Sequence, residues 1–276
     1  MGGGTVLVTG ASSGIGEASV AALIGRGFEV WASVRTEEDE RRLLARHGEA
    51  VTVRRCDITN PDHIRALGTE LTSRGSLVGL VNNAGIAVPS PLEVLPLDQF
   101  RYQLEVNLVG QLAVAQAVLP VLRATRGRIV MVGSIGDRIA WPMLGAYHAS
   151  KFGLLGLTDS LRAELAPLGI RVVLIEPGVV ASRIWRSGTA RGDELLAGLQ
   201  FDATSAYQAQ IDRTRAEALR LASRGQAPSV VAAVIAKALT ATNPRPRYLV
   251  GRDAKMAALI AQLPLRLRYR ITSSRV

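Results

Sequence analysis

Short apolar runs alternate along this chain with longer segments in which apolar residues recur at helical spacing. Parallel strands buried on both faces read as near-continuous apolar runs, whereas a helix that covers a sheet is apolar on one face. Strands that alternate with helices through short connections are typical of βαβ units, so we expect an α/β fold, a doubly wound parallel sheet with helices on both faces. The runs predict about seven strands, at Thr5–Thr9, Glu29–Val34, Val51–Arg55, Leu77–Val81, Arg128–Val132, Arg171–Ile175 and Tyr248–Val250.

Length and hydrophobic content indicate the domain organisation. A chain of 276 residues with 48% hydrophobic content can bury one large core, so we expect a single domain over residues 1–276. The segment 183–225 is polar and helical without an obvious strand, which is typical of a lid over a substrate pocket. The sequence shows no secretory leader and no apolar stretch approaching about 18 residues, so we expect no membrane span.

Cysteine usage and charge indicate the location of the protein and the kinds of partner it could bind. The single cysteine, Cys56, excludes an internal disulfide and fits a reducing, cytoplasmic location, and zinc-type spacing is absent, so no metal site is expected. The formal net charge of +10 suggests nucleic acid or anionic lipid as partners. The arginines are spread along the chain, however, and no aromatic-basic alternation for stacking on bases is visible. We therefore expect no nucleic-acid partner.

The C-terminal segment 252–276 is a basic extension. From Leu265 to Val276 it carries four arginines and no acidic residue. At most, it predicts a weak peripheral contact with an acidic membrane surface. A frayed tail or a tail that packs on another subunit is an equally open interpretation.

A glycine-rich turn follows the first apolar run. Val6-Leu7-Val8 leads into Thr9-Gly10-Ala-Ser-Ser-Gly14-Ile-Gly16, and an alanine-rich segment with helical periodicity comes next. Glycines at a strand-to-helix turn let the backbone approach a pyrophosphate, which then lies at the positive end of the helix dipole. The turn therefore predicts a dinucleotide site.

Tyr147 and Lys151 carry the candidate chemistry. Four residues apart on a helix, the phenol and the ammonium lie on one face. An opposite charge within about 4–6 Å lowers the pKa of an acid by about 1–3 units, so we expect a tyrosine that exchanges a proton near neutral pH. Lysine is scarce in this chain, since Lys237 and Lys255 are the only others. This scarcity favours a specific role for the lysine at position 151.

Taken in order, these and further motifs resemble the classical short-chain dehydrogenases/reductases over nearly the whole chain. The motifs are Thr9-Gly10-x-x-x-Gly14-x-Gly16, Asp57, Asn82-Asn83-Ala84-Gly85, Asn107, Ser134, Tyr147-x-x-x-Lys151 and Pro177-Gly178. Phe28–Arg35, Leu92–Pro96 and Arg247–Gly251 are most similar to the 17β-hydroxysteroid and retinol dehydrogenase branch. The resemblance implies a Rossmann-type fold and an oxidoreductase that interconverts an alcohol and a ketone or aldehyde.

The resemblance also implies four catalytic residues. Tyr147 exchanges the proton with the substrate oxygen, and Ser134 is a second donor at that oxygen, as in an oxyanion hole. Lys151 lowers the tyrosine pKa and holds the nicotinamide ribose. Asn107, inside an otherwise apolar helix, kinks that helix and holds a water of a proton relay; the alternative is an amide satisfied by neighbouring backbone.

Further residues are implied as the binding site of the cofactor. Asp57 corresponds to an acceptor for the adenine amino group, although a turn-capping aspartate is the alternative. Where NAD-dependent relatives have an acid, this chain has Val34 followed by Arg35, which favours NADP(H) and leaves NAD(H) possible because Glu37 and Glu38 are close. The whole set is Gly10, Ser12, Ser13, Gly14, Ile15, Gly16, Arg35, Asp57, Ile58, Asn83, Ala84, Gly85, Tyr147, Lys151, Pro177, Gly178, Val180 and Ser182.

The expected substrate is apolar, of the steroid, retinoid, polyketide or fatty ketone class. Relatives commonly pair two long helices, here near Asp98–Arg123 and Tyr147–Pro167, so a homodimer or homotetramer is expected. A non-catalytic NADP(H)-binding regulator on the same fold is the alternative, but it would not need all four catalytic positions. The predicted substrate pocket is formed by mostly apolar residues, Ile135, Arg138, Ala140, Met143, Leu144, Val179, Ile184 and Trp185.

Overall fold

Seven parallel strands form one sheet in the computed structural model, which describes residues 3–197 and 206–273. The strand order is β3-β2-β1-β4-β5-β6-β7, so the connection from β3 to β4 crosses back over the first half of the sheet. All seven predicted strands are present, with ends that differ from the prediction by at most two residues. Their bounds are β1 Thr5–Val8, β2 Glu29–Val34, β3 Val51–Arg55, β4 Leu77–Asn82, β5 Arg128–Val132, β6 Arg171–Pro177 and β7 Arg247–Val250.

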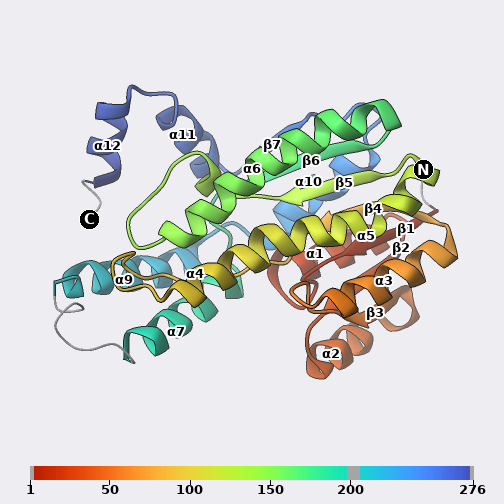
Figure 1. The fold of residues 1–276 in the computed structure, drawn as a ribbon, viewed down its shortest axis with the longest axis horizontal. Helices are drawn as coiled ribbons and strands as arrows, with labels where there is room; N and C mark the ends of the chain where they lie inside the picture. Colours follow the sequence, from red (N-terminus) through yellow and green to blue (C-terminus); the bar gives the residue numbers. More distant parts are fainter. Residues whose placement is uncertain (1–2, 198–205, 274–276) are drawn as a thin grey trace.

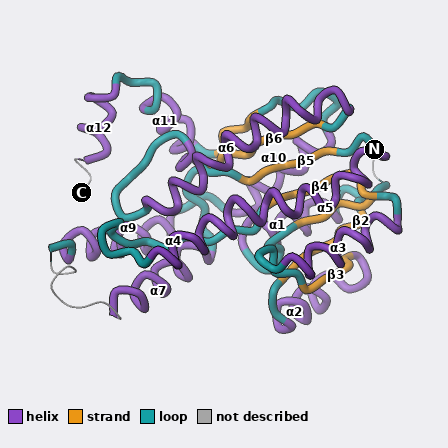
Figure 2. The backbone as a smooth tube through the Cα atoms, in the orientation of Figure 1, coloured by secondary structure: helices purple, strands orange, loops and turns teal. Residues whose placement is uncertain are grey.

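Helices cover both faces of the sheet (Figures 1 and 2). On one face lie α3 (Pro61–Arg74), α5 (Gly110–Thr125) and α6 (Gly145–Leu165). On the other face α1 (Gly14–Ile24) packs against α10 (Pro228–Thr240), and α2 (Glu37–His47) packs beside the edge strand β3. The predicted doubly wound Rossmann-type architecture is therefore confirmed.

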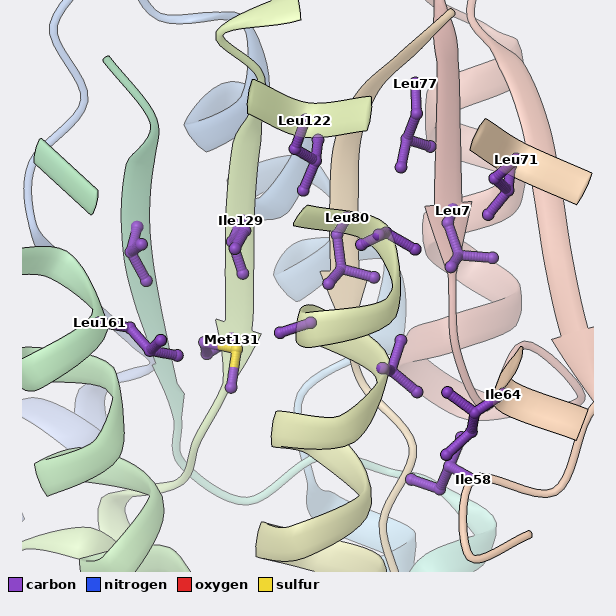
Figure 3. Packing of buried hydrophobic residues seen from close by; sticks show 14 of the residues in the cluster. Leu7, Ile58, Ile64, Leu71, Leu77, Leu80, Leu122, Ile129, Met131 and Leu161 are labelled. Atoms are coloured by element: carbon purple, nitrogen blue, oxygen red, sulfur yellow. The ribbon is translucent and has the colours of Figure 1, made fainter. Parts of the chain in front are cut away.

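The core is divided between the two faces by the alternation of side chains along each strand. Leu7, Leu80 and Met131 face α3, α5 and α6, as Figure 3 shows, whereas their neighbours Val6 and Val81 face α1 and α10. Successive strand residues point to opposite faces, so the strands inside the sheet are mostly apolar on both faces. This is why the strands were visible in the sequence as continuous apolar runs.

A long helical run crosses the first of these faces. It comprises α4 (Leu97–Leu104), a π-helical turn (Glu105–Val109) and α5. By length and composition the run Leu97–Thr125 could cross a membrane, so the expectation that no apolar stretch approaches that length was wrong. Here α5 packs on α3 and β4, and its apolar residues belong to the core.

Four further helices lie around the end of the sheet opposite the N-terminus (Figure 1). Two of them, α7 (Arg183–Ala197) and α9 (Gln208–Arg224), pack on each other within the predicted lid. The other two, α11 (Arg252–Ile260) and α12 (Leu265–Ser273), form the predicted basic extension. Residues 198–205 of the predicted lid and 274–276 of the extension lie outside the described residues.

Candidate active site

The glycine turn after β1 has the geometry that a dinucleotide needs. Gly10 and Gly14 have positive φ angles of 62° and 56°, which side chains other than glycine rarely adopt. A Cβ at Gly10 would lie 2.7 Å from the Cα of Ala84, and one at Gly16 would lie 2.2 Å from the carbonyl oxygen of Gly10. The glycines therefore keep an open cradle of backbone at the start of α1, which fits a pyrophosphate.

The side chains of Thr9 and Asn83 connect this turn to the end of the neighbouring strand β4. The Asn83 amide donates to the carbonyl oxygens of Thr9 and Gly10 at 3.0 and 3.1 Å. The Thr9 hydroxyl accepts from the backbone N–H groups of Asn83 and Ala84 at 2.9 and 3.1 Å. These four bonds tie the end of β1 to the end of β4, where the strand order reverses.

A cavity of about 240 Å³ opens at this point of reversal, beyond the carboxyl ends of the strands. In open α/β sheets this is the place where ligands bind. Gly16 does not line the cavity, because it is packed between β1 and β4. The other predicted cofactor residues line it, namely Gly10, Ser12, Ser13, Gly14, Ile15, Arg35, Asp57, Ile58, Asn83, Ala84, Gly85, Tyr147, Lys151, Pro177, Gly178, Val180 and Ser182.

The end of β2 presents donors to the cavity. Arg35 is exposed and lines the cavity, and no carboxylate of the described residues lies within ion-pair distance of it. The nearby acid Glu37 pairs with Arg41 at 3.7 Å. The buried hydroxyl of Ser33, which also lines the cavity, has no hydrogen-bond partner within the described residues. This end of the cavity therefore offers a guanidinium and a free hydroxyl.

Asp57 has one of the two roles that the sequence left open, and the other stays a prediction. Its Oδ1 accepts from the backbone N–H and the hydroxyl of Thr59 at 2.9 and 2.8 Å, so the carboxylate caps the turn after β3. The residue also lines the cavity. The second carboxylate oxygen, Oδ2, takes no part in this turn and is the atom that could accept from an adenine amino group.

Three of the four predicted catalytic residues come together at the cavity. Ser134 ends the loop after β5, and its hydroxyl accepts from the Gly136 N–H at 3.0 Å. Tyr147 and Lys151 extend from the first turns of α6, are 8% and 6% exposed, and line the same cavity as Ser134. The Lys151 ammonium lies 5.8 Å from the centre of the tyrosine ring and donates to the Val132 carbonyl oxygen at 3.0 Å.

The expected lowering of the tyrosine pKa is wrong for this structure. Burial raises the pKa of Tyr147 to about 12, although its hydrogen bond with Ser134 acts in the opposite direction. Burial also lowers the pKa of Lys151 to about 8. Removing a charged group from water disfavours its charged form, and burial is the largest cause of both shifts. Tyr147 is therefore a neutral proton donor at pH 7.

Asn107 lies one layer behind the cavity, at the π-helical turn between α4 and α5. The predicted irregularity of the helix is confirmed. The Asn107 Oδ1 accepts from the Ile86 N–H at 2.9 Å, and Nδ2 donates to the Ile86 carbonyl and the Ser150 hydroxyl at 2.9 and 3.0 Å. The alternative of an amide satisfied by neighbouring backbone is thus present, and the water relay stays a prediction.

Of the eight residues of the predicted substrate pocket, Ile184 alone lines this cavity, and the substrate pocket stays a prediction. Ile135 packs on Ala257 and Ala258 of α11, and Met143 lines a separate small cavity. Arg138 is turned away and pairs with the buried Glu176 at 2.5 Å. Ala140, Leu144 and Val179 do not line the cavity, and the side chain of Trp185 lies outside the described part of the structure.

Several residues that line the cavity were not predicted from the sequence. Arg183 and Ser187, on the first turns of α7, line it beside Ile184. Gly188 and Gly192 let α7 approach the loop after β4, since a Cβ at each would lie within 3 Å of the carbonyl oxygens of Ala87 and Pro89. A pair of glycines four residues apart is a signal of such close packing. The other missed residues are Ser33, Cys56, Ile86, Val106, Val132 and Gly133.

Comparisons with known proteins agree with this geometry. A family model described as short chain dehydrogenase matches residues 4–192. The chain is 38% identical over 255 residues to a 3-amino-tetrahydro-pyrrolizinone reductase of Xenorhabdus hominickii, covering 91% of this chain and 88% of that protein. It is 34% identical over 274 residues to retinol dehydrogenase 16 of Mus musculus, covering 94% and 84%. A solved short-chain dehydrogenase of Burkholderia cenocepacia J2315 in complex with NADP matches with a TM-score of 0.76 and 27% identity, covering 98% of each chain.

Proposed function

The chain belongs to the short-chain dehydrogenase family, and we propose that it interconverts an alcohol and a ketone or aldehyde on an apolar substrate, with NADP(H) as the preferred cofactor. The family consists of oxidoreductases that act on CH–OH groups with NAD(P). The observation that carries the proposal is that the side chains of Ser134, Tyr147 and Lys151 line the same cavity as the open glycine cradle. A carbonyl oxygen placed there meets two donors.

The mechanism follows from the protonation states. A bound nicotinamide supplies or accepts the hydride. In the direction of reduction Tyr147, neutral at pH 7, donates its proton to the carbonyl oxygen, and Ser134 stabilises the negative charge that develops there. Lys151 presents a positive charge next to the tyrosinate that forms. Its ammonium is fixed to the Val132 carbonyl, so it needs no rearrangement during the reaction.

The apolar residues of the cavity support an apolar substrate. Ile86, Val106 and Ile184 line the cavity together with Ser134 and Tyr147. The relatives named for a tetrahydro-pyrrolizinone and for retinol point to a ring ketone or a long polyene alcohol. The class we propose is a steroid, retinoid, polyketide or fatty ketone.

A lid of α7 and α9 would cover this substrate. The cavity-lining residues Arg183 and Ile184 begin α7, and the Arg215 guanidinium of α9 pairs with Asp193 of α7 at 2.5 Å. The Tyr207 hydroxyl also donates to Glu93 at 2.5 Å, which connects the segment before α9 to the loop after β4. These contacts support one dinucleotide-binding and catalytic domain with residues 183–225 as its lid.

The location and the assembly are part of the proposal. A cytoplasmic homodimer or homotetramer would cover Phe152, which is 45% exposed on α6 beside the partly buried Leu155. Weak contact with an anionic lipid surface would fall to α11 and α12, where exposed apolar residues such as Leu259 and Leu267 alternate with Lys255 and Arg266. Light scattering and sedimentation with phosphatidylserine vesicles separate these possibilities.

Following NADPH absorbance against a panel of bulky and small ketones tests the activity. Tyr147→Phe removes the proton donor and leaves the glycine cradle intact. We expect it to lose nearly all turnover while NADPH fluorescence still reports binding of the cofactor. A variant that kept about a tenth of the wild-type rate would be incompatible with Tyr147 as the donor, since general acid catalysis contributes about 10²–10⁴-fold.

A further inference from the structure

A second pair of acidic groups lies buried directly behind the catalytic loop. Asp137 follows Ser134 in the short helical turn Ile135–Asp137, and Glu176 lies near the end of β6. Both carboxyl side chains are 0% exposed. The Arg138 guanidinium forms a fork with Glu176, with N–O distances of 2.5 and 3.0 Å, so one of the two acids is neutralised.

Asp137 is left without such a partner. Neither of its carboxylate oxygens has a hydrogen bond of ordinary length within the described residues, and its Oδ1 lies 4.0 Å from the Arg138 Nε. Two negative charges in one dry site are strongly unfavourable, and an unpaired buried carboxylate is more so. A proton shared by the two carboxyls removes the second charge and supplies the missing hydrogen bond at once.

The Asp137 carboxyl lies against the residue that joins β5 to the catalytic loop. A Cβ on Gly133, the residue before Ser134, would lie 2.9 Å from the Asp137 Oδ2. Gly133 follows Val132, whose carbonyl oxygen binds the Lys151 ammonium. A negative charge on Asp137 raises the pKa of both Tyr147 and Lys151. The charge state of Asp137 therefore affects the proton donor directly.

We propose that Asp137 and Glu176 share one proton, and that the pair is a positioning element that sets the pH at which Tyr147 changes its protonation state. Asp137 carries the proton and donates it to Glu176. When base removes that proton to solvent, the site gains a negative charge that opposes loss of the Tyr147 proton. This role rests on the proposed function, since it acts through Tyr147.

The other charged groups around the pair do not replace this proton. Burial lowers the pKa of His148, and its two ring nitrogens bind the Gly136 carbonyl and the Trp141 N–H, so its imidazole is neutral. From α11, Arg252, Asp253 and Lys255 are exposed. Burial and the charge of Glu176 raise the pKa of Asp137 to about 8, which agrees with a protonated acid at neutral pH.

Infrared spectroscopy of the protein alone tests the shared proton without any substrate. We expect a carbonyl band of a protonated carboxyl in the wild type at pH 7, which disappears above pH 8 and is absent from Asp137→Asn. A spectrum with no such band at pH 7 would overturn the proposal. This measurement holds even if the chain turns over none of the tested ketones, an outcome that counts against the proposed function alone.

The pH profile of alcohol oxidation tests the effect on Tyr147. In Asp137→Asn the side chain at position 137 is always neutral. The apparent pKa of Tyr147 in the pH profile should therefore fall by roughly one unit, the lower end of the shift that a nearby charge produces. Glu176→Gln leaves Arg138 to pair with Asp137, so this variant should lack the infrared band at pH 7, whereas its profile should not move above that of the wild type, in which Asp137 is also charged when Tyr147 ionises. Glu164→Gln, on the exposed far part of α6, should change neither the band nor the profile. Loss of stability in Asp137→Asn with an unshifted profile would mean that the pair is only structural.

Discussion

The Lys151 ammonium and the Val132 carbonyl oxygen form a hydrogen bond of 3.0 Å that fixes a side chain of α6 to the end of β5. Because Val132 precedes the loop that carries Ser134, the contact sets the position of the lysine relative to both catalytic hydroxyls. The lysine is almost fully buried, so its charge acts in a medium of low dielectric. A substitution at this position therefore changes both the electrostatics and the geometry of the site.

Lys151→Met should lose rate and also weaken cofactor binding. We expect a decrease in kcat of about 10²–10⁴-fold, the usual contribution of proton-transfer machinery, together with a higher Kd for NADPH in a fluorescence titration. Lys255→Met, exposed on α11, is the matched control and should change neither quantity. An unchanged Kd in Lys151→Met would remove this lysine from the cofactor site.

Gly16 should tolerate no side chain, because its Cβ would lie 2.2 Å from a backbone oxygen. Forcing an extra methyl group into such a packed site costs about 1–3 kcal/mol, so Gly16→Ala should lower the free energy of unfolding by that amount and displace the glycine turn. Urea unfolding and NADPH titration measure the two effects.

Gly156 on α6 is the control for that substitution, since a Cβ there meets no atom within 4 Å. Replacing a helical glycine in open space by alanine stabilises a protein by about 0.5–1 kcal/mol. Opposite signs for the two variants are the expected result. Equal effects would show that the Gly16 contact is relieved by small shifts of the backbone.

The sheet could be predicted because burial on both faces makes its inner strands mostly apolar. The ends of the strands were less visible where a polar residue is itself buried, as are Asn82 and Glu176, both fully buried at the ends of β4 and β6. The cofactor residues followed from the motifs, since most of them lie directly after a strand and the carboxyl ends of parallel strands meet at one edge of the sheet.

The contacts of two predicted pocket residues could not be predicted, because their partners are distant in the sequence. Ile135 packs on Ala257 of α11 and Arg138 pairs with Glu176, so neither lines the cofactor cavity. The predicted lowering of the Tyr147 pKa was wrong for a related reason. The spacing of Tyr147 and Lys151 shows the neighbouring charge, but not the burial that outweighs it.

Cys56 should react slowly with alkylating reagents in the native protein. It is 3% exposed, and burial raises the pKa of its thiol to about 11, with a smaller contribution from the charge of Asp57. The thiolate is the reactive form, so labelling by iodoacetamide should stay slow at pH 8 and rise only as the pH approaches 11. As the sequence has no other cysteine, mass spectrometry reads this site alone.

The same shift has a consequence for stability. The pKa of Cys56 is higher in the folded protein than in the unfolded chain, so the folded state holds the proton more tightly between about pH 9 and 11. The stabilising contribution is complete below this window and is lost as the pH rises through it. The free energy of unfolding of Cys56→Ala should therefore decrease less than that of the wild type between these pH values. Rapid labelling of Cys56 at pH 8 would contradict the raised thiol pKa on which this prediction rests.

Arg35 should decide between the two cofactors. If its exposed guanidinium binds the 2′-phosphate, Arg35→Ala removes charged hydrogen bonds worth roughly 1.5–3 kcal/mol and raises the KM for NADPH by about ten- to a hundredfold. The KM for NADH should change little. Arg41→Ala is the matched control, because it removes the same charge from an exposed position of α2 that pairs with Glu37.

Val34→Asp tests the same position from the opposite side. A carboxylate at the end of β2 repels a phosphate and accepts a hydrogen bond from a free ribose hydroxyl, so this variant should prefer NADH more strongly than the wild type. Steady-state kinetics with both cofactors compares all four proteins. A wild-type enzyme that prefers NADH, or an Arg35→Ala variant weakened equally for both cofactors, would show that the 2′-phosphate is not bound at this strand end.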